Sequence, residues 1–245
     1  MENKVSIVGI STSPRVGANT ERMVEEALLA GERLGAEVGF SVETEIISLA
    51  KKKILPCYNC DLCIEQRRHC PVEDDWLDIV SKLTEPTPDG LIFGSPVYFF
   101  NMNSLGRAFM ERFTGLLKKI WFPDFPYDPP DFSQTAAGAI AVGADRHGGI
   151  EHTLSEIIHW LLIMGFVTVG GFYIGGGGWT HEDDSRDAIE KDELGLESAR
   201  LVGRKVAKIA ILLKRGAATF EREIPFILWK EQEQTLKQRE EVSQP

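Results

Sequence analysis

The sequence predicts a three-layer α/β fold, in which helices cover both faces of a five-stranded parallel sheet. Five apolar segments of strand length recur along the chain, and segments with helical spacing of apolar residues separate them. Strands that alternate with helices form parallel sheets, because each crossover helix returns the chain to the same end of the sheet. The chain has 245 residues, of which 43% are hydrophobic, so it is long enough to bury one such core.

The expected strands are short and carry few charges. The third of them has no polar residue, as a strand covered on both faces requires. The five segments are residues 5–10, 44–49, 90–94, 135–142 and 166–174.

The expected helices show apolar residues at every third or fourth position. In the first of them this spacing joins Met23, Ala27, Ala30 and Leu34. The five segments are residues 21–34, 76–83, 105–117, 151–164 and 192–214.

The domain organisation is simple. We expect residues 1–218 to form one domain that includes a cysteine-rich loop over residues 50–71, while the composition changes over residues 219–245. This tail joins a short apolar stretch to a charged one, so we expect a C-terminal arm that contacts a partner subunit. The Pro-rich stretch within Trp121–Phe132 is surrounded by aromatic residues, which indicates an ordered excursion and not a linker.

Composition excludes several classes of partner. The net charge is −10 and the sequence pI is about 5.1, so DNA or RNA would be repelled. No apolar stretch reaches the roughly 20 residues that span a bilayer. The N-terminus lacks the basic flank and the cleavage site of a secretory signal. We therefore expect a cytoplasmic protein that binds neither nucleic acid nor membrane.

The segment from Ser11 to Thr20 lies between the first strand and the first helix and has the character of a phosphate-binding loop. A helix N-terminus offers backbone N–H groups and a favourable dipole to an anion. The loop adds side-chain donors and one cation: Ser11, Ser13, Asn19, Thr20 and Arg15. It lacks the Gly-Lys-Ser/Thr of a Walker motif and the spaced glycines of a dinucleotide fingerprint, which disfavours ATP and a Rossmann-type NAD site. A plain turn, with Asn19 or Thr20 as the N-cap, is the alternative.

All the cysteines of the chain fall within fourteen residues: Cys57, Cys60, Cys63 and Cys70. In a reducing cytosol such clustering favours metal or redox chemistry over structural disulfides. Two-residue gaps and a trailing Cys-Pro are typical of [4Fe-4S] ligands. Zinc sites usually separate two cysteine pairs by a longer loop. A [4Fe-4S] cluster is the favoured interpretation; zinc, unligated thiols and a regulatory disulfide stay open. We expect His69, beside Cys70, to be exposed.

Several motifs together resemble the NAD(P)H-dependent FMN reductases and the iron-sulfur flavoproteins related to them, which have a flavodoxin-like fold. The phosphate loop matches in Gly9-Ile10-Ser11-Thr12-Ser13-Pro14-Arg15 and Gly17-Ala18-Asn19-Thr20. Gly94-Ser95-Pro96-Val97-Tyr98 is similar to the second flavin loop, and Gly148-Gly149-Ile150-Glu151-His152-Thr153 to the third. The last helix matches in Asp192, Gly195, Ala199 and Gly203, so the resemblance covers roughly residues 5 to 210.

The resemblance implies FMN as cofactor, with its phosphate on the first loop. Ser11, Ser13, Asn19 and Thr20 would hold the phosphate, and Arg15 would assist. The flavin ring would lie against residues of the other two loops: Ser95, Pro96, Val97, Tyr98, Asn101, Gly148 and Gly149. No second nucleotide motif appears, which favours FMN over FAD.

The compact cysteine spacing resembles the iron-sulfur flavoproteins in particular, whose cysteine motif follows the second strand. There the cluster lies near an FMN of a neighbouring subunit, which implies a homodimer or a homotetramer. We expect electron transfer from a ferredoxin-like carrier or NAD(P)H to a small-molecule or protein acceptor, with no acid or base catalyst in the chain. One alternative is an NAD(P)H-dependent FMN or quinone reductase in which the cysteines hold zinc or stay unligated. A thiol or zinc-binding module with a vestigial flavin pocket is another.

Overall fold

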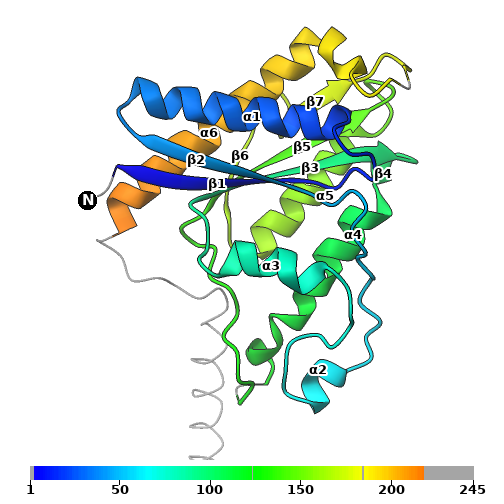
Figure 1. The fold of residues 1–245 in the computed structure, drawn as a ribbon, viewed down its shortest axis with the longest axis vertical. Helices are drawn as coiled ribbons and strands as arrows, with labels where there is room; N and C mark the ends of the chain where they lie inside the picture. Colours follow the sequence, from blue (N-terminus) through cyan, green and yellow to red (C-terminus); the bar gives the residue numbers. More distant parts are fainter. Residues whose placement is uncertain (1–2, 123, 184, 218–245) are drawn as a thin grey trace, which may run out of the picture.

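The computed structural model describes residues 3–122, 124–183 and 185–217, and it contains the three expected layers (Figure 1). The strands are β1 (Lys4–Ser11), β2 (Ser41–Ser48), β3 (Gly90–Tyr98), β4 (Asn101–Met102), β5 (Ala136–Gly143), β6 (Val167–Val169) and β7 (Gly176–Trp179). The α-helices are α1 (Asn19–Glu37), α2 (Leu62–Glu65), α3 (Trp76–Thr84), α4 (Ser104–Glu111), α5 (Ile150–Ile163) and α6 (Glu193–Gly216). Three 3₁₀ turns are η1 (Arg112–Gly115), η2 (Lys118–Ile120) and η3 (Ala188–Lys191).

The order of the strands confirms the predicted fold class. The parallel sheet runs β2-β1-β3-β5-β6, and β7 continues beside β5 where β6 ends. Leaving aside the short β4, which pairs antiparallel with β3, this is the flavodoxin-like order 2-1-3-4-5. In that order the switch point lies between β1 and β3, so the loops after these two strands meet at one edge of the sheet.

Two elements differ from the expectation. The fifth strand was expected as one segment over residues 166–174, but it is divided into β6 and β7 by a loop that turns back where Gly171 N–H donates to Tyr173 O. The second half was missed because Gly176–Trp179 is glycine-rich and has low β propensity. The expected helix over residues 105–117 is α-helical only to Glu111, after which η1 tightens the chain.

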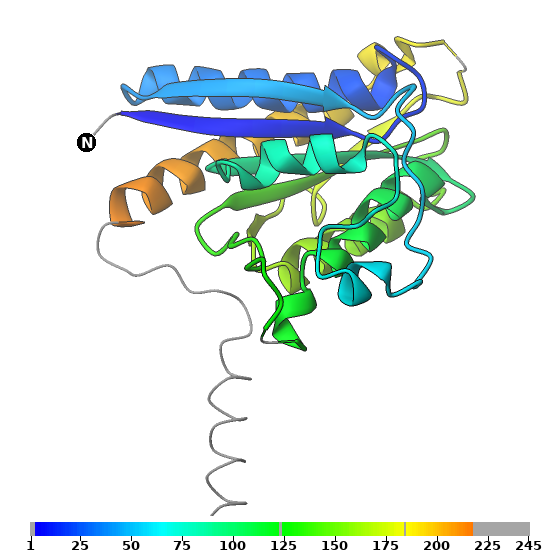
Figure 2. The same cartoon turned by 60° about the horizontal axis from the view of Figure 1, so that its bottom comes forward.

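Apolar side chains fill both sides of the sheet. One buried cluster joins the sheet to α3, α4 and α5, and a second joins it to α1 and α6. Figure 2 shows the sheet between these two helical layers. No described helix is long and apolar enough to cross a lipid bilayer. The predicted arm over residues 219–245 lies outside the described residues.

Helices α1 and α6 come into close backbone contact at Gly203. A Cβ atom at this position would overlap the backbone carbonyl of Ala27 on α1. The two helices, which lie side by side in Figure 1, can therefore keep this separation only with glycine there.

We predict that Gly203→Ala lowers the free energy of unfolding by about 1–3 kcal/mol, because the added methyl group overpacks the helix contact. Gly216→Ala is the matched control, since a Cβ at the end of the same helix meets nothing. Urea unfolding of both variants tests the prediction. Equal stability of the two variants would contradict it.

Candidate functional site

The loops after β1 and β3 are bonded to each other at the carboxyl edge of the sheet. Thr12 N–H donates to Gly94 O at 2.9 Å, which continues the strand pairing by one residue. The side chain of Asn103 then joins the loops on its own. Its Nδ2 donates to Thr12 O at 2.6 Å, and its Oδ1 accepts from Thr12 Oγ1 at 2.8 Å.

The Asn103 side chain makes two further hydrogen bonds, and the residue is 2% exposed. Its Oδ1 accepts from Ser95 Oγ at 3.2 Å and from Gly106 N–H at 3.3 Å, so the same oxygen caps helix α4. Asparagine is a frequent N-cap before an apolar helix, and this was the one sequence signal that could have singled it out. Asn103 was not among the site residues predicted from the sequence.

The first loop has the features of an anion site. Ser11 is fully buried, and its Oγ has no hydrogen-bond partner among the described residues. Helix α1 begins after Ala18, whose methyl side chain cannot cap it. The alternative in which Asn19 or Thr20 serves only as the N-cap therefore does not describe this loop. The amides of the first turn and the Ser11 hydroxyl remain for an outside acceptor, which fits a phosphate.

The other residues predicted on this loop have different surroundings. Ser13 Oγ accepts from Arg15 N–H at 3.1 Å, a turn that shapes the loop. Thr20 is 2% exposed, and Arg15 is half-buried. The Asn19 amide bonds instead within the protein: its Nδ2 donates to Ser185 O and its Oδ1 accepts from Ile189 N–H, each at 3.0 Å.

The second loop is a two-residue hairpin with a strained tip. Tyr98 pairs with Asn101, and Phe99 and Phe100 form the turn between them with φ angles of 52° and 71°. Positive φ at both turn positions suits Asn-Gly, and bulky residues adopt it at a cost. Phe99 is fully exposed at this tip. Of the other predicted ring contacts, Ser95 and Pro96 are buried, Val97 is half-buried, and Tyr98 and Asn101 are exposed.

The third loop touches the tip of this hairpin. Gly149 precedes α5 with a φ angle of 108°, and a Cβ there would overlap the backbone of Phe100. Gly148 beside it is half-buried. His147 and His152 are exposed, as surface histidines would be. The three predicted flavin loops therefore meet at one edge of the sheet.

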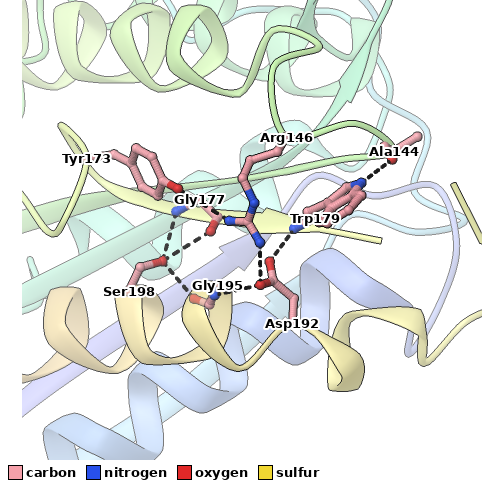
Figure 3. A network of polar contacts seen from close by, with 8 residues as sticks. All are labelled: Ala144, Arg146, Tyr173, Gly177, Trp179, Asp192, Gly195 and Ser198. Atoms are coloured by element: carbon pink, nitrogen blue, oxygen red, sulfur yellow. Dashed lines mark hydrogen bonds and ion pairs between the residues drawn. The ribbon is translucent and has the colours of Figure 1, made fainter. Parts of the chain in front are cut away.

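A polar network that the sequence analysis did not find fixes the third loop (Figure 3). Arg146 forms an ion pair with Asp192 at 2.6 Å and donates to Tyr173 Oη at 3.3 Å. Asp192 is 3% exposed and also accepts from Trp179 N–H on β7 and from Gly195 N–H on α6. Burial lowers the pKa of Arg146, but the hydrogen bonds to Asp192 and Tyr173 outweigh it and raise the pKa overall.

The four cysteines line one small pocket. Cys57 and Cys60 are exposed, Cys63 and Cys70 are half-buried, and Arg112 and Lys118 complete the wall. Burial raises the pKa of the Cys63 thiol, and nearby Lys118 opposes this shift. Within the described ranges, no three Cys, His, Asp or Glu side chains come close enough to hold a single metal ion. A four-iron cluster takes each thiolate on a separate iron, so a pocket lined by spread thiols fits it.

The stems of the cysteine loop are held by Asp74, whose carboxylate is fully buried. It accepts from Leu55 N–H at 2.8 Å, from Trp76 N–H at 3.1 Å and from Arg112 Nη1 at 2.6 Å. Arg112 Nη1 donates in addition to Leu55 O at 3.2 Å. The base of the loop is thus fixed from both sides, although the loop itself is largely exposed.

The Pro-rich excursion packs on the cysteine loop. The rings of His69 and Tyr127 stack with centroids 3.8 Å apart, and Arg67 pairs with Asp124 at 2.5 Å. His69 is half-buried by this contact, which corrects the expectation that it is exposed. The described part of the Trp121–Phe132 segment therefore packs against one side of the cysteine loop.

Comparison with known proteins agrees with this arrangement. The sequence profile of the NADPH-dependent FMN reductase family matches residues 5–180. An iron-sulfur flavoprotein of Methanocaldococcus jannaschii is 38% identical over 86% of this chain and all of its own length. An iron-sulfur flavoprotein of Archaeoglobus fulgidus is 32% identical over 83% of this chain and 96% of its own. The crystal structure of RosB with a bound riboflavin-5'-phosphate derivative shares the fold, with a TM-score of 0.60 and 16% identity over 98% of this chain and 88% of that one.

The fold and the family profile define a flavodoxin-like redox protein of the FMN reductase type. The chain belongs to the NADPH-dependent FMN reductase family, among its iron-sulfur flavoprotein members.

We predict that Asn103→Asp lowers the free energy of unfolding by about 2–3 kcal/mol and weakens flavin retention. The carboxylate keeps the acceptor oxygens, but it replaces the donor to Thr12 O and buries a charge. Chemical denaturation and flavin content after gel filtration measure the two effects. Asn3→Asp, at an exposed amide that donates only to Gly39 O, is the control. A variant as stable and as flavin-rich as the control would contradict the role of Asn103.

Proposed function

We propose that the chain is an FMN- and [4Fe-4S]-containing redox flavoprotein that transfers electrons from a reduced carrier to an acceptor. The carrier is a ferredoxin-like protein or NAD(P)H, and the acceptor is a small molecule or a protein. The observation that carries the proposal is the presence, on one chain, of a pocket lined by four cysteines and a separate anion loop at the switch point of the sheet.

FMN would bind through its phosphate on the first loop. The buried Ser11 hydroxyl and the amides at the start of α1 supply donors, while Ser13, Thr20 and Arg15 border them. Asn19 would contribute mainly by fixing the loop to the segment before α6, because its side-chain amide is bonded there. A terminal phosphate suits this loop, which supports FMN over FAD.

The flavin ring would lie where the second and third loops meet. Ser95, Pro96, Val97, Tyr98 and Asn101 supply one side, and Gly148 and Gly149 supply the other. The absence of a side chain at Gly149 keeps the two loops in contact. The strained tip at Phe99 and Phe100 belongs to this region, and strain of this kind is found where a loop is held in a functional conformation.

Cys57, Cys60, Cys63 and Cys70 would hold the cluster as thiolates. FMN accepts one or two electrons and a [4Fe-4S] centre moves one, so their pairing divides a two-electron delivery into single steps. The chain contributes the hydrogen bonds, the charge and the burial around each group. Relatives that are named iron-sulfur flavoproteins support the assignment of an iron-sulfur centre.

The proposed assembly is a homodimer or homotetramer in the cytoplasm. Phe99, Phe100, Leu162 and Ile163 are all more than half exposed, and an apolar surface of this kind suits contact with another subunit.

Anaerobic purification followed by iron, sulfide, zinc and flavin analysis tests the proposal most directly. We expect about four iron and four sulfide for each FMN. FMN with zinc and no iron would instead support an NAD(P)H-dependent FMN or quinone reductase in which the four cysteines hold zinc. Flavin extracted as FAD would overturn the assignment of the first loop.

The double variant Ser13→Ala with Thr20→Ala should retain FMN at least tenfold more weakly, because two donors that border the phosphate are removed. Equilibrium dialysis with FMN measures the change, and circular dichroism checks that the sheet stays folded. Ser81→Ala, with an exposed hydroxyl that bonds only to Asp78 O, is the control. Equal affinity of the double variant and the control would count against the loop.

Cys60→Ala should remove most of the iron and sulfide and leave FMN bound, because the cysteine loop and the phosphate loop are separate segments. Leu62→Ala alters an exposed side chain of the same loop and should keep both cofactors. Metal, sulfide and flavin analysis of the two proteins gives the answer. Full iron content in the Cys60 variant would refute its assignment as a ligand.

The same variant distinguishes a relay from a structural cluster. With a relay, dithionite still reduces the flavin of Cys60→Ala, while its oxidation by a one-electron acceptor protein slows at least tenfold. A structural cluster would instead lower thermal stability and flavin retention together. Stopped-flow absorbance and thermal unfolding separate the two outcomes.

A further inference from the structure

Arg112 is a buried cation with unused donors beside the cysteines. It is 1% exposed and lines the pocket formed by Cys57, Cys60, Cys63 and Cys70. Its Nε and Nη2 are buried from solvent and have no hydrogen-bond partner in the part of the chain that the structure describes. Buried donors of a guanidinium are rarely left unpaired, since water no longer solvates them.

The rest of the side chain is firmly held. Nη1 alone makes both protein bonds, to the Asp74 carboxylate and to Leu55 O. The guanidinium carbon lies 4.7 Å from the centre of the Trp76 ring, so one face of the group is stacked. Fixed in this way, the guanidinium cannot turn its other nitrogens out to solvent.

The protein bonds of Arg112 do not by themselves explain an arginine. A lysine amine could pair with Asp74 and donate to Leu55 O, and it would leave fewer buried donors unpaired. The additional N–H donors of arginine are useful where a further acceptor lies beside Asp74 and Leu55 O. The other groups that line the pocket offer four thiols as such acceptors.

We propose that Arg112 Nε and Nη2 donate hydrogen bonds to sulfur atoms of the [4Fe-4S] cluster and raise its reduction potential. The inference rests on the proposed cluster. Hydrogen-bond donors and a fixed positive charge stabilise the reduced cluster more than the oxidised cluster, because the reduced cluster carries one more negative charge. Asp74 is then a positioning residue, which holds the guanidinium and both stems of the cysteine loop at once.

The test compares Arg112→Lys with Arg204→Lys in the full chain with both cofactors. Arg204 lies on α6 and pairs with exposed Glu37, so its replacement controls for the loss of a guanidinium at the surface. Redox titration followed by electron paramagnetic resonance gives the cluster potential, and iron, sulfide and flavin analysis gives its occupancy. We expect Arg112→Lys to make reduction of the cluster about tenfold less favourable, a shift of about 59 mV to lower potential for one electron.

A measurement on the unmodified protein avoids dependence on the variant's folding. With ¹⁵N-arginine incorporated, pulsed electron paramagnetic resonance of the reduced cluster should detect a ¹⁵N coupling that Arg204→Lys retains. Arg112→Lys, where it folds with a full cluster, should lack it.

The outcomes are distinct. A full cluster in Arg112→Lys at an unchanged potential would overturn the inference and leave the proposed cluster intact, as would the absence of a ¹⁵N coupling in the unmodified protein. A wild-type protein without iron and sulfide would overturn the proposed function itself, and this inference with it. A lowered potential together with the lost coupling supports it.

Discussion

The pairing of β1 with β3 at the centre of the sheet is the constraint on which the site depends. It brings the end of β1, at Ser11, beside Gly94 of β3, so both following loops begin at one point. Thr12 extends the pairing by one backbone bond, and the Asn103 side chain then substitutes for further pairing where the strands diverge. Because Asn103 is buried, its bonds are not exchanged for bonds to water. The loop after β1 is thereby held in shape from the sheet side, and no side chain at the N-cap closes the start of α1.

The fold was largely predictable because its signals are local. Uninterrupted apolar runs mark buried parallel strands, and α1 and α6 carry a regular apolar stripe. Prediction failed where tertiary contacts decide the backbone. Gly176–Trp179 forms a strand because it completes the ladder beside β5, in spite of three glycines in succession. The helix expected over residues 105–117 changes its winding at Arg112, where the side chain turns into the buried pair with Asp74.

The same distinction applies to the candidate site. Residues whose role follows from contiguous sequence, such as the cysteines and the serines of the first loop, could be nominated from spacing and composition. Three other residues could not be predicted, because their hydrogen-bond partners are distant in the sequence. Asn103 bonds to Thr12, Arg146 to Asp192 and Arg112 to Asp74, at separations of 91, 46 and 38 positions. Asn19 illustrates the reverse case. It was nominated for its donor chemistry, yet its side-chain amide bonds to Ser185 and Ile189, which lie 166 and 170 positions further along the chain.

Helix α4 connects the two candidate cofactor sites. Asn103 caps its first turn and holds the phosphate loop, and Arg112 follows its last residue at the cysteine pocket. Eight helical residues at about 1.5 Å each give a spacer of about 12 Å. The helix is fixed along its length, because Trp76 Nε1 donates to Phe109 O and the ring of Phe109 packs against Phe93 and Phe113. If the cysteine loop shifts and carries Arg112 with it, helix α4 must move as well. If the helix stays in place, the bond between Arg112 and Asp74 must break. The two candidate sites are accordingly held at one separation within the chain, while Cys57 and Cys60 stay exposed on the outer side of the cysteine loop.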